Sequence, residues 1–174
     1  LNTRPAKSAH AYAQVWTKDG SPLAAITRQQ AEALQDRLGD PEQGAVKVDW
    51  AMRYGRPAIA DKVQALKDAG FDRILFAPLY PQYSGATTAT AVDALGAALA
   101  KMRWQPAIRT LPPYHDDPAY IAALQADIAR QVSALDWTPE VVLLSFHGMP
   151  ERTLQLGDPY HCHCRKTARL LAEA

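Results

Sequence analysis

The stretch that decides the fold is Val141-Val142-Leu143-Leu144-Ser145-Phe146-His147-Gly148-Met149-Pro150. Its run of four aliphatic residues predicts a strand that is buried on both faces, as in a parallel sheet. Gly148 and Pro150 then end strand pairing. His147 is therefore expected at the carboxyl end of a parallel strand, where open α/β sheets bind their ligands. A neutral imidazole there can accept a proton or bind a metal ion; the alternative is a structural histidine that a loop carbonyl satisfies.

Upstream of this stretch, the hydrophobic pattern alternates between strand-like and helix-like segments. Apolar residues spaced three and four apart predict helices over residues 5–16, 27–38, 57–69, 92–102 and 118–135. Short apolar or alternating runs predict strands over residues 22–26, 45–52, 72–79 and 107–111. This order indicates an α/β fold, with a parallel sheet flanked by helices and candidate site residues just past the carboxyl ends of its strands.

Two of the predicted helices carry start signals. Thr27, with Gln30 three residues later, has the spacing of a capping box. Asp117 before Pro118 is typical of an N-cap followed by proline in the first turn.

Length and composition limit the class of protein. The 174 residues suffice for one large domain, or one domain and part of another, and 48% hydrophobic with 21% charged residues is ordinary for a globular chain. A net charge of +1 without basic runs gives no indication of nucleic-acid binding. No apolar run approaches the ~20 residues that span a bilayer, and residues 1–20 contain no signal-peptide core. Two cysteines fit a reducing compartment, so we expect a cytoplasmic location.

Four groups of residues, in this order along the chain, resemble the ferrochelatase family, whose members insert ferrous iron into a porphyrin. They are Gly20-Ser21-Pro22-Leu23; Met52-Arg53-Tyr54-Gly55; Pro78-Leu79-Tyr80-Pro81-Gln82-Tyr83-Ser84 with Thr87-Thr88; and Ser145-Phe146-His147-Gly148-Met149-Pro150 with Gly157-Asp158-Pro159-Tyr160. Together they extend over nearly the whole chain. Four segments in the family's order make coincidence a poor explanation.

The resemblance, to the bacterial type of this family, implies two similar Rossmann-like α/β domains. Residues 1–137 correspond to the first domain without its first strand, and residues 138–174 to the beginning of the second domain, which carries His147. Family members are considerably longer, so we expect this chain to be a fragment that is inactive alone. The family pairs its histidine with a glutamate in the second domain, beyond Ala174, so that role cannot be assigned here.

Metal insertion requires two pyrrole protons to leave, a hydrated cation to lose water and the flat macrocycle to bend. By the resemblance, His147 is the expected catalytic base and metal ligand. Arg53 is expected to hold a propionate carboxylate bidentately. Aromatic or hydroxyl side chains that could contact the porphyrin are Tyr12, Ser21, Tyr54, Tyr83, Ser84 and Thr88. The alternatives are a solvated charge for Arg53, rim packing for Tyr54 and Tyr83, and a helix cap for Thr88.

The segment His161-Cys162-His163-Cys164 concentrates soft metal ligands. No second pair follows at zinc-finger spacing, and a [2Fe-2S] cluster takes four cysteines whereas the chain has two. We therefore predict the start of a helix with partly buried thiols. No tightly bound cofactor is expected, since Fe²⁺ enters as a substrate.

Three functions are compatible with the sequence. The first is iron insertion into protoporphyrin IX or coproporphyrin III, with peripheral membrane contact compatible with so apolar a substrate. The second is a cobalt chelatase of another tetrapyrrole, although such enzymes use several histidines. The third is a module that binds a tetrapyrrole or a sugar-like ligand without chemistry.

Overall fold

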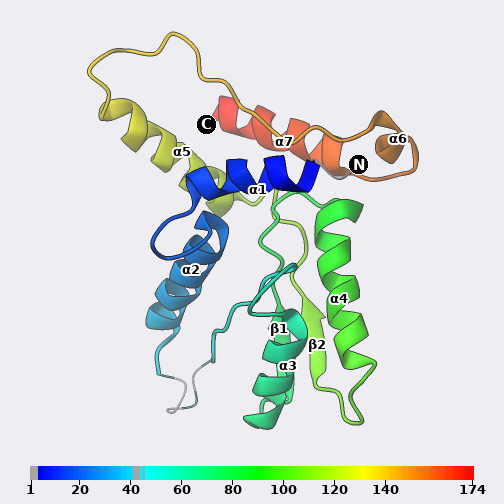
Figure 1. Ribbon diagram of the computed structural model, residues 1–174. Coiled ribbons are helices and arrows are strands. Elements are labelled where there is room, and N and C mark those ends of the chain that lie inside the picture. The colour runs from blue at the N-terminus through cyan, green and yellow to red at the C-terminus, as the bar shows by residue number, and fades with distance from the viewer. Residues whose placement is uncertain (1–3, 41–43, 45) are drawn as a thin grey trace. The chain divides into compact units, whose positions relative to one another are not determined.

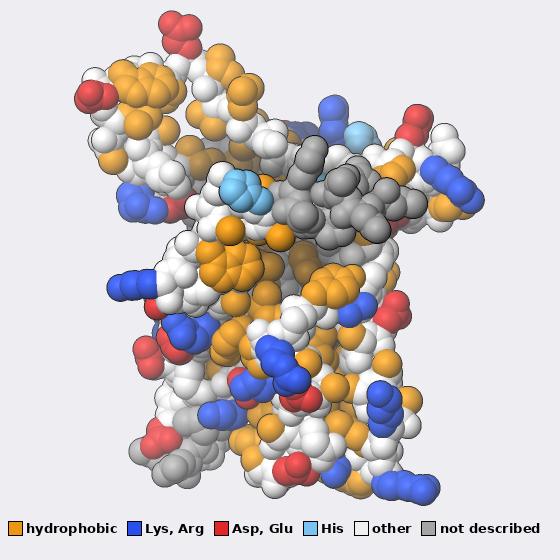
Figure 2. Space-filling model, in the orientation of Figure 1, with side chains coloured by type: hydrophobic (Ala, Val, Ile, Leu, Met, Phe, Trp, Pro, Cys, Tyr) orange, Lys and Arg blue, Asp and Glu red, His pale blue; other side chains and the backbone are white. Residues whose placement is uncertain are grey.

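The computed structural model describes residues 4–40, 44 and 46–174 (Figure 1). The chain divides into two compact units, Leu1–Gly70 and Phe71–Ala174. Among the described residues, no helix is long and apolar enough to cross a membrane. On the face drawn in Figure 2, side chains of both charge signs are interspersed.

The first unit contains α1 (Arg4–Val15), α2 (Pro22–Leu38) and α3 (Ile59–Asp68). Helix α2 begins at Ser21, whose hydroxyl oxygen accepts the backbone N–H of Ala24 at 3.2 Å, with Pro22 in the first turn. The strand predicted over residues 22–26 is therefore wrong. Thr27 is not a cap either, since it lies inside α2 and donates its hydroxyl to the carbonyl of Leu23 at 2.7 Å.

The strand predicted over residues 45–52 does not form in the described part of that range, where Met52 makes only an isolated bridge with Ala58; Ala45 lies outside the described residues. The side chain of Gln35 takes the place of a neighbouring strand. Its amide nitrogen donates to the carbonyl of Val46 at 3.0 Å, and its amide oxygen accepts the N–H of Val48 at 2.7 Å. Two backbone polar groups of this segment are thus satisfied by one side chain rather than by a ladder.

The second unit contains a βαβ arrangement. Strands β1 (Arg73–Phe76) and β2 (Ala107–Thr110) pair in parallel, with Arg73 opposite Ala107 and Phe76 opposite Thr110. The π-helix η2 (Gly85–Ala89) continues into α4 (Thr90–Leu99) and connects the strands (Figure 1). The small parallel sheet with its flanking helices confirms the predicted α/β fold class.

Helix α5 (Pro118–Ser133) follows β2, and α6 (Glu151–Gln155) and α7 (Tyr160–Glu173) complete the unit. The carboxylate of Asp117 accepts the N–H groups of Ala119 at 2.8 Å and Tyr120 at 3.3 Å, so the predicted N-cap of α5 is confirmed. Helix α5 packs on α7. In α4, Ala91, Leu95 and Ala98 form the buried stripe, at spacings of four and three.

The aliphatic run of residues 141–144 is not a strand. The segment of residues 141–150 contains no regular secondary structure, and Val141 and Leu143 are 71% and 88% exposed. A strand with two buried faces needs hydrogen-bonding neighbours as well as an apolar sequence, and no described segment pairs with it. The domain boundary predicted between residues 137 and 138 stays a prediction.

Candidate functional site

In the second unit, the loop after β1 leads into a π-helix, a feature that occurs frequently at functional sites. Ser84 is 1% exposed, and its hydroxyl oxygen accepts the N–H of Ala86 at 3.2 Å as the N-cap of η2. The carbonyl of Ser84 accepts the N–H of Ala89 at 3.3 Å. Both the hydroxyl and the carbonyl of Ser84 therefore take part in starting η2.

Asp158 joins this loop to the beginning of α7. Its Oδ2 accepts the hydroxyl of Ser84 at 3.0 Å and the N–H of Gly85 at 2.8 Å, and its Oδ1 accepts the N–H of Tyr160 at 3.0 Å. Burial acts to raise the pKa of Asp158, but the bonds from Gly85, Tyr160 and Ser84 together lower the pKa below its usual value. The Gly157-Asp158-Pro159-Tyr160 segment is thus a turn with an ionised carboxylate that accepts three hydrogen bonds.

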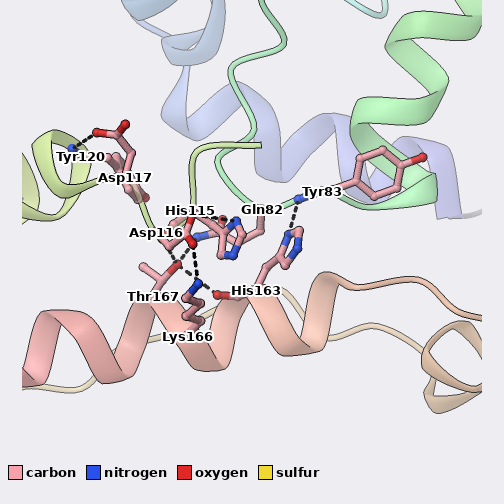
Figure 3. Close-up of polar contacts among 9 residues, drawn as sticks. All are labelled: Gln82, Tyr83, His115, Asp116, Asp117, Tyr120, His163, Lys166 and Thr167. Atoms are coloured by element: carbon pink, nitrogen blue, oxygen red, sulfur yellow. Dashed lines mark hydrogen bonds and ion pairs between the residues drawn. The ribbon is translucent and has the colours of Figure 1, made fainter. Parts of the chain in front are cut away.

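His163, one helical turn further along α7, holds the same loop (Figure 3). Its Nδ1 accepts the backbone N–H of Tyr83 at 3.1 Å, and its ring stacks on that of His115 with centroids 3.6 Å apart. Burial, followed by the charge of His115, lowers the pKa of His163. Both observations favour a neutral imidazole at this position.

Around the two histidines, α7 also contacts the loops after β1 and β2 through Lys166 and Thr167 (Figure 3). Lys166 forms an ion pair with Asp116. The hydroxyl of Thr167 donates to the carbonyl of His115 at 2.7 Å and accepts the amide of Gln82 at 3.1 Å. Helix α7 therefore supports both loops from one side.

His147, the predicted catalytic base, is exposed in the segment before α6. Its backbone interacts with the phenol of Tyr160; burial raises the pKa of that phenol, against a smaller lowering by the His147 backbone. His147 and the Ser84 loop are thus both connected to the first turn of α7. Of the predicted site residues in this unit, Tyr83 is half-buried, and Ser84 and Thr88 are buried. Contact of their hydroxyls with a ligand stays a prediction.

In the first unit, Arg53 and Tyr54 lie together. The guanidinium carbon of Arg53 is 4.4 Å from the centroid of the Tyr54 ring, a cation–π contact. The Nε of Arg53 is buried and has no hydrogen-bond partner among the described residues. Tyr12 is exposed on α1, and the hydroxyl of Ser21 caps α2. A partly exposed guanidinium on an aromatic face is suited to a carboxylate ligand.

Sequence reasoning missed the role of Asp158 and of the His115–His163 stack. Asp158 lay in a segment already singled out by resemblance, and a turn-forming Gly-Asp-Pro next to a predicted helix start was its available signal. No sequence signal connects two histidines 48 positions apart. Their proximity follows from the packing of α7 on the loop after β2.

The thiols agree with the prediction of a helix start with partly buried cysteines. Cys162 is exposed and Cys164 is buried on α7, and both are free. Within the part of the chain that the structure describes, no group of three or more His, Cys, Asp or Glu side chains is arranged to hold a metal ion.

The model of the Ferrochelatase family matches residues 1–174. The chain belongs to the ferrochelatase family. It is 56% identical to a ferrochelatase of Rhizobium meliloti over 99% of its length, and 52% identical to one of Agrobacterium fabrum over 100%. A ferrochelatase of Azoarcus sp. is 51% identical over 100% of the chain. The alignments cover 51%, 51% and 47% of these relatives, so the chain spans about half the length of the curated ferrochelatases it matches.

Proposed function

We propose that this chain is part of a ferrochelatase that inserts Fe²⁺ into a porphyrin, protoporphyrin IX or coproporphyrin III, in heme biosynthesis. The observation that carries the proposal is the family match over all of residues 1–174. The exposed His147 and the Arg53–Tyr54 pair support it, because they supply a base and a carboxylate clamp of the kinds that the reaction needs.

The reaction exchanges two pyrrole protons for one Fe²⁺. The neutral nitrogen of His147 accepts one pyrrole proton at a time, and its lone pair can also bind the incoming cation before transfer. A second base, either a carboxylate or water, takes the other proton. Because His147 is exposed, a proton that it accepts can pass on to solvent.

Arg53 has a different task in this proposal. The Tyr54 ring beneath the guanidinium orients the cation, and the Nε of Arg53 retains an unused donor. A propionate carboxylate balances the charge in a fork-shaped pair with the terminal guanidinium nitrogens. Anchoring the propionates provides binding energy for bending the ring at its centre.

Porphyrin and ferrous iron are thus the proposed partners, with Fe²⁺ a substrate rather than a resident cofactor. The two free cysteines of α7 support a reducing, cytoplasmic location. Peripheral membrane contact is part of the proposal, because the substrate itself is apolar.

The test is an absorbance assay of the full-length protein with protoporphyrin or coproporphyrin and Fe²⁺ under anaerobic conditions. Wild type should convert the porphyrin spectrum to that of the iron complex. His147→Ala should lower kcat by about 10²–10⁴-fold, the range for loss of a general base. The matched control is His161→Ala, another exposed histidine of the same unit, which should retain wild-type activity.

Two outcomes would redirect the proposal. Porphyrin binding without a metal-dependent spectral change indicates a binding module. Activity confined to Co²⁺ and another tetrapyrrole indicates a cobalt chelatase.

A further inference from the structure

Four neighbouring residues of the loop after β1 are fixed to the beginning of α7. The amide of Gln82 donates to Thr167, the backbone N–H of Tyr83 to His163, and the hydroxyl of Ser84 and N–H of Gly85 to Asp158. Ser84 and Thr167 are 1% and 2% exposed, so the bonds that they make are shielded from water, whereas the bond of Gly85 is exposed. The loop conformation is therefore set from α7.

The hydrogen bond from Tyr83 to His163 forms in only one protonation state of the imidazole. The Nδ1 of His163 accepts the N–H of Tyr83 at 3.1 Å, so this nitrogen must carry no proton and the neutral ring carries its proton on Nε2 (Figure 3). An imidazolium has an N–H at both positions. Protonation would place two donors against each other and break the bond to Tyr83.

The groups around His163 come from several elements. His115 faces its ring from the loop after β2, with planes 8° apart, and Asp116 follows in the same loop. Asp158 precedes α7, and Lys166 lies on α7 itself. Burial, His115 and Lys166 disfavour the imidazolium, whereas Asp116 and Asp158 favour it; the net effect lowers the pKa of His163. The neutral acceptor is thus the form present near neutral pH.

We propose that neutral His163 is a positioning residue for the porphyrin: by accepting the Tyr83 N–H, it holds Tyr83 and the beginning of η2 in the conformation that receives the ligand. This inference rests on the proposed function. His163 does not touch the substrate in this account. It acts through the backbone of Tyr83, and protonation releases that backbone.

The test uses the full-length protein with two substitutions of His163. His163→Asn places an amide oxygen near the position of Nδ1 and cannot titrate, whereas His163→Leu removes the acceptor. His161→Asn is the matched control, since His161 is exposed on the same helix. Porphyrin Kd, KM and kcat are measured at about pH 7.5 and in steps down to the lowest pH at which the protein stays folded, and hydrogen exchange reports on the amides of residues 82–86.

At about pH 7.5, His163→Leu should raise the porphyrin Kd and KM by about two- to tenfold, the equivalent of one net hydrogen bond, with kcat at saturation nearly unchanged. His163→Asn should stay within about twofold of wild type. As the pH falls below 6.5 and through the lowered pKa of His163, wild type should come to bind more weakly than His163→Asn, and the Tyr83 amide should exchange faster in wild type. Comparison with the asparagine variant cancels every pH effect that the two proteins share.

Equal porphyrin affinity of wild type and His163→Leu would overturn the positioning role. So would equal pH dependence of wild type and His163→Asn, even if the leucine variant failed to fold. If wild type itself binds no porphyrin, the proposed function is wrong, and the positioning role is wrong with it. Binding by wild type with no difference among the variants overturns the positioning role alone.

Discussion

The rings of His115 and His163 lie face to face in the second unit, with centroids 3.6 Å and planes 8° apart. Burial lowers the pKa of both imidazoles below their usual value of 6.5. The stack therefore joins the loop after β2 to α7 most firmly when both rings are neutral. Protonation brings a charge into a partly buried contact.

The first prediction concerns stability in acid. The unfolded chain takes up histidine protons near pH 6.5, whereas the folded state does so at lower pH. As the pH falls through this interval, the unfolded state binds more protons, so the free energy of unfolding should decrease. Above pH 6.5 the contribution is fully present, and below the folded-state pKa values it is lost. Urea unfolding followed across this range measures the effect.

His115→Phe isolates the contribution of one ring. The phenyl ring keeps a stacking face. Nδ1 of His115 makes no hydrogen bond to the described residues, so the substitution removes only its 3.7 Å contact with Oδ1 of Asp116. The decrease in stability with falling pH should therefore be smaller in this variant than in wild type. His161→Phe, at an exposed position, serves as the control. An unaltered pH profile in His115→Phe would show that this ring does not contribute.

The second prediction concerns Asp158. In Asp158→Asn an NH₂ group replaces one of the two carboxylate oxygens, so at least one of the donors from Ser84, Gly85 and Tyr160 loses its acceptor. The free energy of unfolding should decrease by ~1–3 kcal/mol at neutral pH.

The pH dependence of this contribution follows from the lowered pKa of Asp158. In wild type the contribution is present above the unfolded-state pKa of 3.8 and is lost as the pH falls through the lower folded-state pKa. The free energies of unfolding of wild type and Asp158→Asn should therefore become similar in strong acid. A difference in the free energy of unfolding that stays constant at every pH would contradict the lowered pKa of Asp158.

The third prediction contrasts two buried threonines. Thr167→Val leaves the amide of Gln82 and the carbonyl of His115 without their partner, so it should destabilise the protein by ~1–3 kcal/mol. The hydroxyl of Thr88 has no partner among the described residues, so Thr88→Val should change stability by less than ~0.5 kcal/mol. Chemical denaturation of both variants tests the contrast, and an equal decrease in the free energy of unfolding would contradict it. Weaker porphyrin binding by Thr88→Val alone would support the predicted ligand contact.

Helices were largely predictable from the sequence, because their signals are local. The Asp117-Pro118 start of α5 and the apolar spacing around Leu95 in α4 both describe what the structure contains. The start of α2 was mistaken for a strand because the short apolar run after Pro22 fits either periodicity. Ser21 before Pro22 was the cap signal that decides between them.

Strands were less predictable, since each depends on a partner distant in the sequence. Residues 73–76 and 107–110 pair in parallel and form a ladder. Residues 141–144 have the strongest strand pattern but no pairing segment among those described. The hydrogen bonds that hold the candidate site could not be predicted from the sequence for the same reason. The bonds from Tyr83 to His163 and from Ser84 to Asp158 join residues far apart in the chain.

The fourth prediction concerns Arg53 in the full-length protein. Arg53→Leu should raise the porphyrin KM by about tenfold or more, since a charge-assisted bond contributes ~1.5–3 kcal/mol, while kcat changes little. Arg56→Leu is the matched control, because Arg56 is an exposed arginine three positions away that pairs with Asp61 at 3.2 Å. Porphyrin saturation curves for both variants provide the measurement. An unchanged KM with a collapsed kcat would refute the clamp.

The last prediction compares residues 1–174 alone with the full-length protein. His147 is exposed here, and the aliphatic run before it has no paired strand in the described part of the chain. A solvated site loses the low dielectric that strengthens catalytic electrostatics, and it cannot hold the macrocycle in a bent form. One histidine also accepts one proton at a time, whereas two must leave for each metal inserted. Loss of a second general base alone typically lowers the rate by about 10²–10⁴-fold.

Residues 1–174 should therefore show no more metal insertion than His147→Ala in the full-length protein, even where they retain porphyrin affinity. Side-by-side assays at equal porphyrin and Fe²⁺ concentrations, with this variant as background, test the expectation. Turnover by residues 1–174 within about tenfold of full length would mean that they contain a complete site. In that case the second base would have to be sought among the carboxylates near the first turn of α7, beginning with Asp158, which already lies beside the Tyr83–Gly85 loop.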